Sequence, residues 1–355
     1  MRSPSSWPGV LVADVLCLDD APSLGVYIHW PFCEAICPYC DFNVHPVRDM
    51  QTADWRKGYS LALAHGQTMR ADGPVDTVFF GGGTPSLMPP ELIANLLADI
   101  DRRWGLAACA EISLEANPVS APQAHLQALK AAGITRLSLG VQALDAAALK
   151  FLGRTHSLEQ AEAAFVAARG IFDRVSLDLI YARPGQSLDG WAQELEHALE
   201  LAPSHMSLYQ LTIEPDTAFF KRHAAGKFQM PDEALAADMY ELTQNLCAAA
   251  GLPAYEVSNH AREGHACRHN LANWRGGDYL GIGPGAHGRV STGQARMATH
   301  ALAKPAAWLE SLVGGGDGFL EKRRLEPADI QAETVMLGLR LVEGIPMSRL
   351  EAEGV

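Results

Sequence analysis

Three closely spaced cysteines are the residues of this sequence with the clearest chemistry. Cys33, Cys37 and Cys40 lie in the stretch CEAICPYC, with the spacing C-x3-C-x2-C, and the chain has seven cysteines in all. Two kinds of metal site fit this spacing. One is a zinc ion completed by His29 or His45, and the other is a [4Fe-4S] cluster with three protein-held irons and one open iron. The spacing alone does not decide between them.

Other polar and glycine residues follow apolar segments later in the chain. The run GGGTPS comes directly after an apolar segment, and its glycines lack a Cβ, so the backbone there can approach a ligand closely. Carboxylate and amide side chains lie in or just after the next three apolar segments. The candidate ligand-binding residues are therefore Gly82, Gly83 and Thr84 of the glycine run and the later residues Glu115, Gln142 and Asp178.

The elements that must position these residues are strands separated by helices. The predicted strands are 26–29, 75–80, 111–115, 136–140, 175–180 and 206–212, and helical patterns such as 89–104 and 158–169 lie between them. This alternation predicts a parallel sheet with right-handed crossovers. Ligands of such sheets bind at the carboxyl ends of the strands, where the cysteines and polar residues gather. The pattern leaves open whether the sheet closes.

The pattern changes after residue 225. We predict a helix at 232–250, a glycine-rich irregular stretch at 267–288, a hairpin at 289–300 and an amphipathic helix at 326–341. The expected division is an N-terminal tail at 1–23, a main α/β domain at 24–225 and an accessory region at 226–300. Residues 301–355 are expected to begin a helical domain that is cut short.

Composition limits the class of partner and compartment. The chain has 355 residues, is 48% hydrophobic and has a formal net charge of −13, from 28 basic and 41 acidic residues. This balance argues against nucleic acid or an anionic membrane as the main partner. The scattered remaining cysteines favour a reducing compartment, and no secretory signal or spanning apolar run is evident. We therefore expect a cytoplasmic protein.

The segments YIHWPFCEAICPYC, FFGGGTPS and LEANP together resemble the radical S-adenosylmethionine (SAM) superfamily. In that superfamily the amino and carboxylate groups of SAM chelate the open iron, and the reduced cluster cleaves SAM to a radical. The resemblance therefore favours a [4Fe-4S] cluster with SAM over zinc. It also implies an α/β fold, a parallel-sheet partial (β/α)6 barrel with a smaller C-terminal α+β extension.

Within that superfamily the chain is similar to oxygen-independent coproporphyrinogen III oxidases and to the related HemW-type heme chaperones. Tyr27, Gly82 and Glu115 match positions that contact the cluster-bound SAM. A second set matches contacts to a second SAM site of the oxidase: Tyr39, Gly83, Thr84, Gln142, Arg154, Asp178 and, where the oxidase has a different residue type, Thr212. The structural alternative is that these polar groups are satisfied by neighbouring backbone.

Two features separate the relatives. The oxidases have a further cysteine two residues after the third one, where this chain has Phe42. The stretch HNLANW, which starts at His269 and ends at Trp274, resembles the HNxxYW motif of the chaperones but has Asn273 in place of the tyrosine. We therefore predict a heme chaperone that binds heme through His269 and Trp274, and we expect coproporphyrinogen oxidase activity to be absent.

The predicted partners are heme-accepting proteins, with respiratory enzymes as candidates and membrane contact only through those acceptors. The alternative function is the oxidase, which decarboxylates two propionates of coproporphyrinogen III, and a radical SAM enzyme for another substrate is the third. The structural alternative for His269 is a hydrogen-bond donor that fixes a loop, and for Trp274 a core aromatic.

Overall fold

The computed structural model describes residues 24–47, 52–70, 72–293 and 295–354, so the predicted tail at 1–23 lies outside the described residues. The centre of the fold is a parallel sheet. Its strands are β1 Leu24–Trp30, β4 Val75–Gly82, β5 Leu106–Ala116, β6 Arg136–Gln142, β7 Arg174–Tyr181 and β8 His205–Gln210. All six predicted strands are confirmed, although β8 ends before the predicted end at residue 212.

Further strands extend this sheet at both sides to eleven strands within the described residues. β10 Asp278–Ile282 pairs parallel with β1, and β9 Asn259–Ala261 pairs antiparallel with β8. β11 His287–Thr292, β12 Ala295–Ala301 and β13 Phe319–Arg324 complete it with antiparallel pairs, which confirms the predicted hairpin. The order places β13 and β9 at the two edges, so this part of the chain forms no closed barrel.

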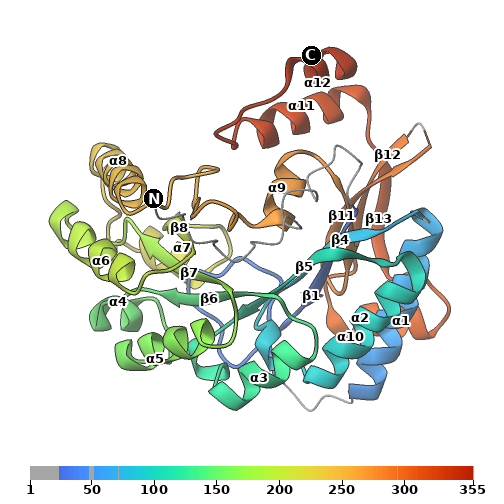
Figure 1. Ribbon diagram of the computed structural model, residues 1–355, viewed down its shortest axis with the longest axis horizontal. Coiled ribbons are helices and arrows are strands. Elements are labelled where there is room, and N and C mark those ends of the chain that lie inside the picture. Colours follow the sequence, from blue (N-terminus) through green and yellow to red (C-terminus); the bar gives the residue numbers. More distant parts are fainter. Residues whose placement is uncertain (1–23, 48–51, 71, 294, 355) are drawn as a thin grey trace, which may run out of the picture.

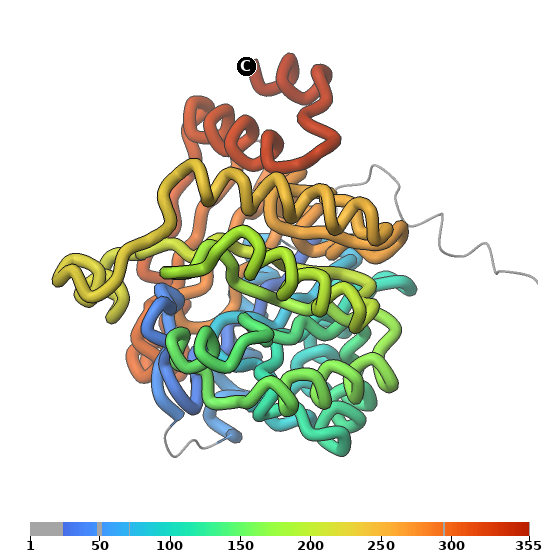
Figure 2. Tube along the Cα trace, turned by 90° about the vertical axis from the view of Figure 1, so that its left-hand side faces the viewer, coloured from blue at the N-terminus to red at the C-terminus, as the bar shows by residue number. Residues whose placement is uncertain are grey.

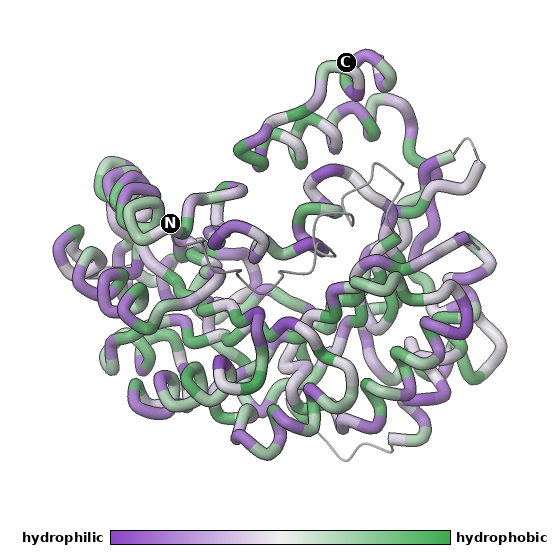
Figure 3. Tube along the Cα trace, viewed as in Figure 1, coloured by the Kyte–Doolittle hydropathy of each residue, from purple (hydrophilic) through white to green (hydrophobic). Residues whose placement is uncertain are grey.

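Helices cover the outer side of the sheet, as Figure 1 shows. They are α1 Thr52–Met69, α2 Pro90–Trp104, α3 Gln123–Ala131, α5 Leu158–Arg169 and α6 Leu188–Glu200. In α2 the buried residues Leu92, Leu96 and Ile100 repeat every four positions and pack on the sheet, which confirms the predicted helix. Figure 3 shows the same alternation of hydrophobic and hydrophilic residues along the helices of this layer.

The remaining elements are shorter or lie outside this layer. They are β2 Phe32–Cys33, β3 His45–Pro46, α4 Ala146–Phe151, α7 Ala218–Ala224, α8 Glu233–Ala249, α9 Arg268–Trp274, α10 Pro305–Val313, α11 Pro327–Gly338 and α12 Met347–Glu353, with 3-10 turns at Pro85–Leu87 and Pro118–Ser120. In Figures 1 and 2, α11 and α12 lie at the opposite side of the molecule from α3 and α5. No helix in the described ranges is long and apolar enough to cross a membrane.

The irregular stretch predicted at 267–288 is a wrong prediction, because it contains helix α9 and strand β10. Tertiary contacts overcome its glycine-rich composition. β10 pairs along its whole length with β1, and a Cβ on Gly281 would lie 1.9 Å from the carbonyl oxygen of His287, so only glycine fits there. The N-terminus of α9 is held by Glu111 of β5, whose carboxylate accepts hydrogen bonds from the backbone N–H groups of Arg268 (2.9 Å) and His269 (3.3 Å).

Candidate functional site

The three cysteines lie on the loop that leaves β1. Cys33 is buried at the end of β2, while Cys37 and Cys40 are partly buried. Two side chains from other loops donate hydrogen bonds to the sulfurs: Thr84 Oγ1, after β4, to Cys33 Sγ (3.4 Å) and Arg154 Nη1, between α4 and α5, to Cys37 Sγ (3.3 Å). Burial raises the pKa of the Cys33 thiol, and the hydrogen bond from Thr84 acts in the opposite direction.

The zinc alternative would need a fourth ligand beside the three cysteines. Among the residues that the structure describes, no group of three or more His, Cys, Asp or Glu side chains is arranged to hold one metal ion. The two candidate fourth ligands are engaged elsewhere, since His29 Nε2 bonds the carbonyl oxygen of Asn43 (2.9 Å) and His45 Nε2 bonds Asn43 Oδ1 (3.2 Å). Cysteines that each bind a different iron of a cube need not converge on one point.

The glycine turn after β4 packs directly against the cysteine loop. Gly82 has φ +110°, and a Cβ there would meet the His29 ring at 2.5 Å. A Cβ on Gly83 would lie 2.7 Å from the carbonyl oxygen of Phe32. Both positions therefore require glycine because the backbone packs closely on His29 and Phe32, whereas the sequence predicted close approach to a ligand.

Two half-buried acidic residues, Glu115 of β5 and Asp178 of β7, lie beyond the glycine turn. Glu115 Oε2 accepts a hydrogen bond from the backbone N–H of Gly82 (3.1 Å), and Asp178 accepts from Ser138 Oγ (2.8 Å) and Ser176 Oγ (2.6 Å). Burial, together with the charge of Asp178, raises the pKa of Glu115 to about 7. Burial likewise raises the pKa of Asp178. An ammonium group bound here would relieve the repulsion between the two carboxylates.

Gln142 and Arg154 connect β6 to the cysteine loop. A bulge between Gly140 and Gln142 disturbs the pairing of β6 with β7, and Gln142 has φ +72°, an unusual value for a residue with a side chain. Arg154 Nη2 donates to the carbonyl oxygen of Gly140 (2.8 Å) while its Nη1 contacts Cys37. Backbone strain retained at a strand end is typical of functional sites.

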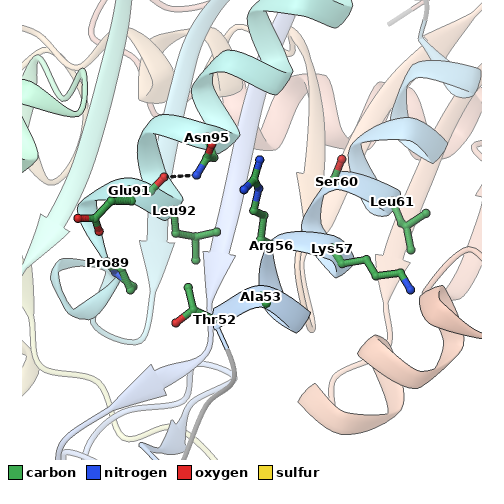
Figure 4. A pocket seen from close by; sticks show the side chains of 10 residues that line it. All are labelled: Thr52, Ala53, Arg56, Lys57, Ser60, Leu61, Pro89, Glu91, Leu92 and Asn95. Atoms are coloured by element: carbon green, nitrogen blue, oxygen red, sulfur yellow. Dashed lines mark hydrogen bonds between the residues drawn. The ribbon is translucent and has the colours of Figure 1, made fainter.

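One cavity of about 880 Å³ brings the predicted residues together. Its lining includes every residue assigned from the sequence to the cluster, to SAM or to heme, and Phe42 as well. The volume lies within the range of small-molecule and cofactor sites. A second groove, of about 610 Å³, lies between α1 and α2 on the outer helical layer and contains none of them (Figure 4).

Helix α9 brings the HN…W residues into the lining of this cavity. The His269 ring is buried, stacks on Phe79 at 5.2 Å between centroids, and bonds Thr77 Oγ1 through Nδ1 (2.8 Å). Burial lowers the pKa of His269 to about 4, so the imidazole is neutral at pH 7. Trp274 packs against the Arg340 guanidinium, 4.4 Å from the ring centroid. The structure thus bears out part of the structural alternative for His269, since the side chain holds α9 against β4.

Comparison with known proteins shows which family has this arrangement. Residues 27–198 match the family model of the radical SAM superfamily. The chain is 39% identical over 329 residues to the heme chaperone HemW of Escherichia coli, which covers 92% of this chain and 84% of that protein. It is 41% identical over 327 residues to the mouse protein named radical S-adenosyl methionine domain-containing protein 1, mitochondrial. This match covers 90% of this chain and 74% of the mouse protein. This chain belongs to the HemW family of radical SAM proteins.

The fold agrees with that membership. The fold is similar to that of the solved structure of the E. coli coproporphyrinogen III oxidase HemN, a radical SAM enzyme, with a TM-score of 0.77. The superposition covers 94% of this chain and 79% of HemN, and the two sequences are 22% identical. The predicted radical SAM fold is confirmed: α/β, dominated by a parallel sheet that does not close. Membership of the superfamily implies a [4Fe-4S] cluster and SAM. Three thiols with hydrogen-bond donors, a glycine turn and paired carboxylates are a donor set that fits both groups.

The structure of this HemW-family chain adds three residues that the sequence analysis missed. Glu111 anchors α9, Arg340 covers Trp274, and Arg136 lies buried on the cavity wall. The sequence could have indicated Arg136, because a charged residue stands at the start of a mostly apolar predicted strand. Glu111 also begins a predicted strand. No sequence pattern indicates Arg340, since its contact with Trp274 joins segments far apart in the chain.

Proposed function

We propose that this chain binds heme and delivers it to acceptor proteins, with a [4Fe-4S] cluster and SAM in the same cavity. One observation carries the proposal: the cysteine and glycine residues and the HN…W residues line a single cavity of about 880 Å³. A ligand bound at α9 would therefore share an enclosed space with the cofactors.

The residues have separate roles in this proposal. Cys33, Cys37 and Cys40 would each bind one iron. When bound and reduced, the cluster supplies the electron that cleavage of SAM requires. Tyr27 and Gly82 would contact the SAM at the open iron, and Glu115 would accept hydrogen bonds from its ammonium group. A second SAM would be contacted by Tyr39, Gly83, Thr84, Gln142, Arg154, Asp178 and Thr212.

Heme would lie at the α9 end. A neutral imidazole is a common axial ligand, and because Nδ1 of His269 bonds Thr77, the nitrogen left for iron is Nε2. The indole of Trp274 would pack on the porphyrin face. Phe42, which is 61% exposed on the cavity lining, occupies the position of the oxidase's additional cysteine.

We further infer a cytoplasmic protein whose acceptors include respiratory enzymes. The net charge of −13 disfavours nucleic acid as a partner. Some relatives carry "mitochondrial" in their names.

The test is heme titration of the anaerobically reconstituted protein, followed by the Soret band, with transfer to an acceptor apoprotein as a second readout. We expect wild type to bind heme and His269→Ala to bind at least about tenfold more weakly, since the axial ligand is lost. The matched control is His260→Gln, because His260 is as buried as His269 but does not line the cavity. A parallel assay offers coproporphyrinogen III. Its conversion, without any heme binding, would assign the chain to the oxidase function instead.

A further inference from the structure

Arg136 is a buried cation in the wall of the cavity. It is the first residue of β6, is 2% exposed, and lines the same cavity as His269 and Trp274. The hydrogen-bond partner of its guanidinium among the described residues is a neutral ring: Nη2 donates to Nδ1 of His205 at 3.3 Å. Burial, and then the charge of Arg136, lowers the pKa of His205 well below its usual value.

Within the described part of the chain, no carboxylate forms an ion pair with this guanidinium. None of the ion pairs between described residues includes Arg136. The nearest acids are engaged by other groups: Glu111 by Arg174 Nη2 (2.9 Å) and by α9, and Asp178 by Ser138 and Ser176. Burial lowers the pKa of Arg136, but Cys267, Glu111, Tyr255 and Asp178 together raise it above the usual value, so the side chain stays charged.

A buried guanidinium without an ion partner is costly to a fold, and the cost is recovered when an anion binds. A second buried donor in the lining of this cavity also lacks an acceptor. At the C-terminal end of α9, Trp274 Nε1 is buried and makes no hydrogen bond to any described residue, whereas the neighbouring Arg340 already pairs with Glu256 (2.9 Å). Arg136 and Trp274 are therefore the donors that a ligand with carboxylates could use here.

We propose that Arg136 binds a carboxylate of the ligand, and that this carboxylate is a propionate of heme. The planar fork of arginine matches a carboxylate in a bidentate pair. This inference rests on the proposed function, since it names a contact within the same heme site. SAM also carries a carboxylate and is the competing source, so the experiment includes both ligands.

The experiment compares heme with its dimethyl ester, in which both propionates are blocked, as ligands of the reconstituted full chain. Wild type should bind heme about tenfold to hundredfold more tightly than the ester. Arg136→Gln should lose that preference by weakening heme binding while leaving ester binding within about threefold, as expected when one charged hydrogen-bond pair is removed. Arg136→Lys should retain part of the preference, because it keeps the charge without the fork.

Arg289→Gln is the matched control, because Arg289 pairs with Glu333 (2.8 Å) and does not line the cavity. It should bind both porphyrins as wild type does, and SAM affinity should be equal in all four proteins. Equal weakening of heme and ester in Arg136→Gln would overturn the inference in favour of a structural role. Loss of SAM binding without loss of heme preference would overturn it in favour of the SAM carboxylate. Wild type that binds heme without any preference over the ester would overturn the Arg136 contact alone, whereas binding of neither porphyrin would overturn the proposed function itself.

Discussion

Glu115 is held in the cavity at a cost to stability. Its carboxylate is buried beside Asp178, and burial raises its pKa from 4.5 to about 7, so the folded state prefers the neutral acid. An unfolded chain has no such preference. The same features suit the residue to an ammonium ligand, because a cation restores the ionised form and removes the repulsion.

Glu115→Gln should therefore stabilise the protein prepared without cluster or SAM, and more so at high pH. Because the pKa is raised on folding, the stability linked to Glu115 is present below pH 4.5 and lost as pH rises through about 7. The gain should approach about 3 kcal/mol at pH 8 and be small at pH 5. Urea unfolding at both values measures it, and an equal gain at the two pH values would contradict the assignment. SAM affinity should fall in the same variant.

The cysteines give a second prediction at this scale. Serine at Cys33, Cys37 or Cys40 should abolish the iron–sulfur absorbance, because one iron then lacks its protein ligand. Cys247→Ala is the control, since Cys247 is fully buried in α8 and does not line the cavity. Iron and sulfide analysis after anaerobic reconstitution measures the result. Stoichiometric zinc, with neither iron nor sulfide, would sink the cluster assignment.

Among the elements, α9 depends most on a single distant residue. It has seven residues, too few to form a stable helix alone. Glu111 of β5 accepts hydrogen bonds from its first backbone N–H groups and also pairs with Arg174 (2.9 Å). A carboxylate at this end also interacts favourably with the helix dipole. The position of His269 in the cavity is thus set from the sheet.

Glu111→Ala should lower the free energy of unfolding by about 3 kcal/mol, because it leaves Arg174 and the helix N–H groups without their acceptor. Glu111→Gln should cost less, since an amide oxygen can still accept from α9. The exposed pair Arg275–Glu343 (2.7 Å) supplies the control, and Glu343→Gln should cost under about 1 kcal/mol. Urea unfolding compares the three, and similar losses for Glu111→Ala and Glu343→Gln would refute the anchoring role.

At the scale of the whole molecule, burial keeps histidines neutral at several places in the described chain, in addition to His29 of β1, whose pKa burial also lowers. Burial lowers the pKa of His156, His260 and His269 to about 4, and that of His205 well below its usual value. They lie on β9, α9, β8 and the loop before α5, so the effect is spread over the fold. An unfolded chain would protonate each of them near pH 6.5.

Acid should therefore destabilise the protein through these groups. Since each pKa is lowered on folding, the stability linked to each histidine is present above pH 6.5 and lost as pH falls toward 4. Each should contribute a loss of about 1 kcal/mol between pH 7 and pH 5.5, while Glu115 acts in the opposite direction. His260→Gln isolates the effect, because neither ring nitrogen of His260 bonds a described residue. Between pH 7 and pH 5.5, the His260→Gln variant should lose about 1 kcal/mol less free energy of unfolding than wild type does. Parallel pH profiles of the two proteins would contradict the linkage.

The sequence by itself determined the residue types of the site and the parallel sheet that carries them. The cysteine spacing, the glycine run and the acidic residue of LEANP are local patterns. Apolar strands alternating with amphipathic helices are also local, because hydrophobic periodicity depends on neighbouring residues. Gly82 and Gly83 were expected to let the backbone approach a ligand, and the structure shows that a Cβ at either position would collide with His29 or Phe32.

Only the tertiary structure determined how the site residues come together around one cavity. α9 and β10 form in a stretch that looked irregular, because Glu111 and β1, both more than a hundred residues away, supply the hydrogen bonds that its glycine-rich sequence does not predict. The same distant packing leaves Arg136 buried without a carboxylate partner among the described ion pairs, and joins the HN…W residues to the cysteines around one cavity. Such contacts join residues remote in the chain, so their geometry depends on the assembled fold rather than on local propensity.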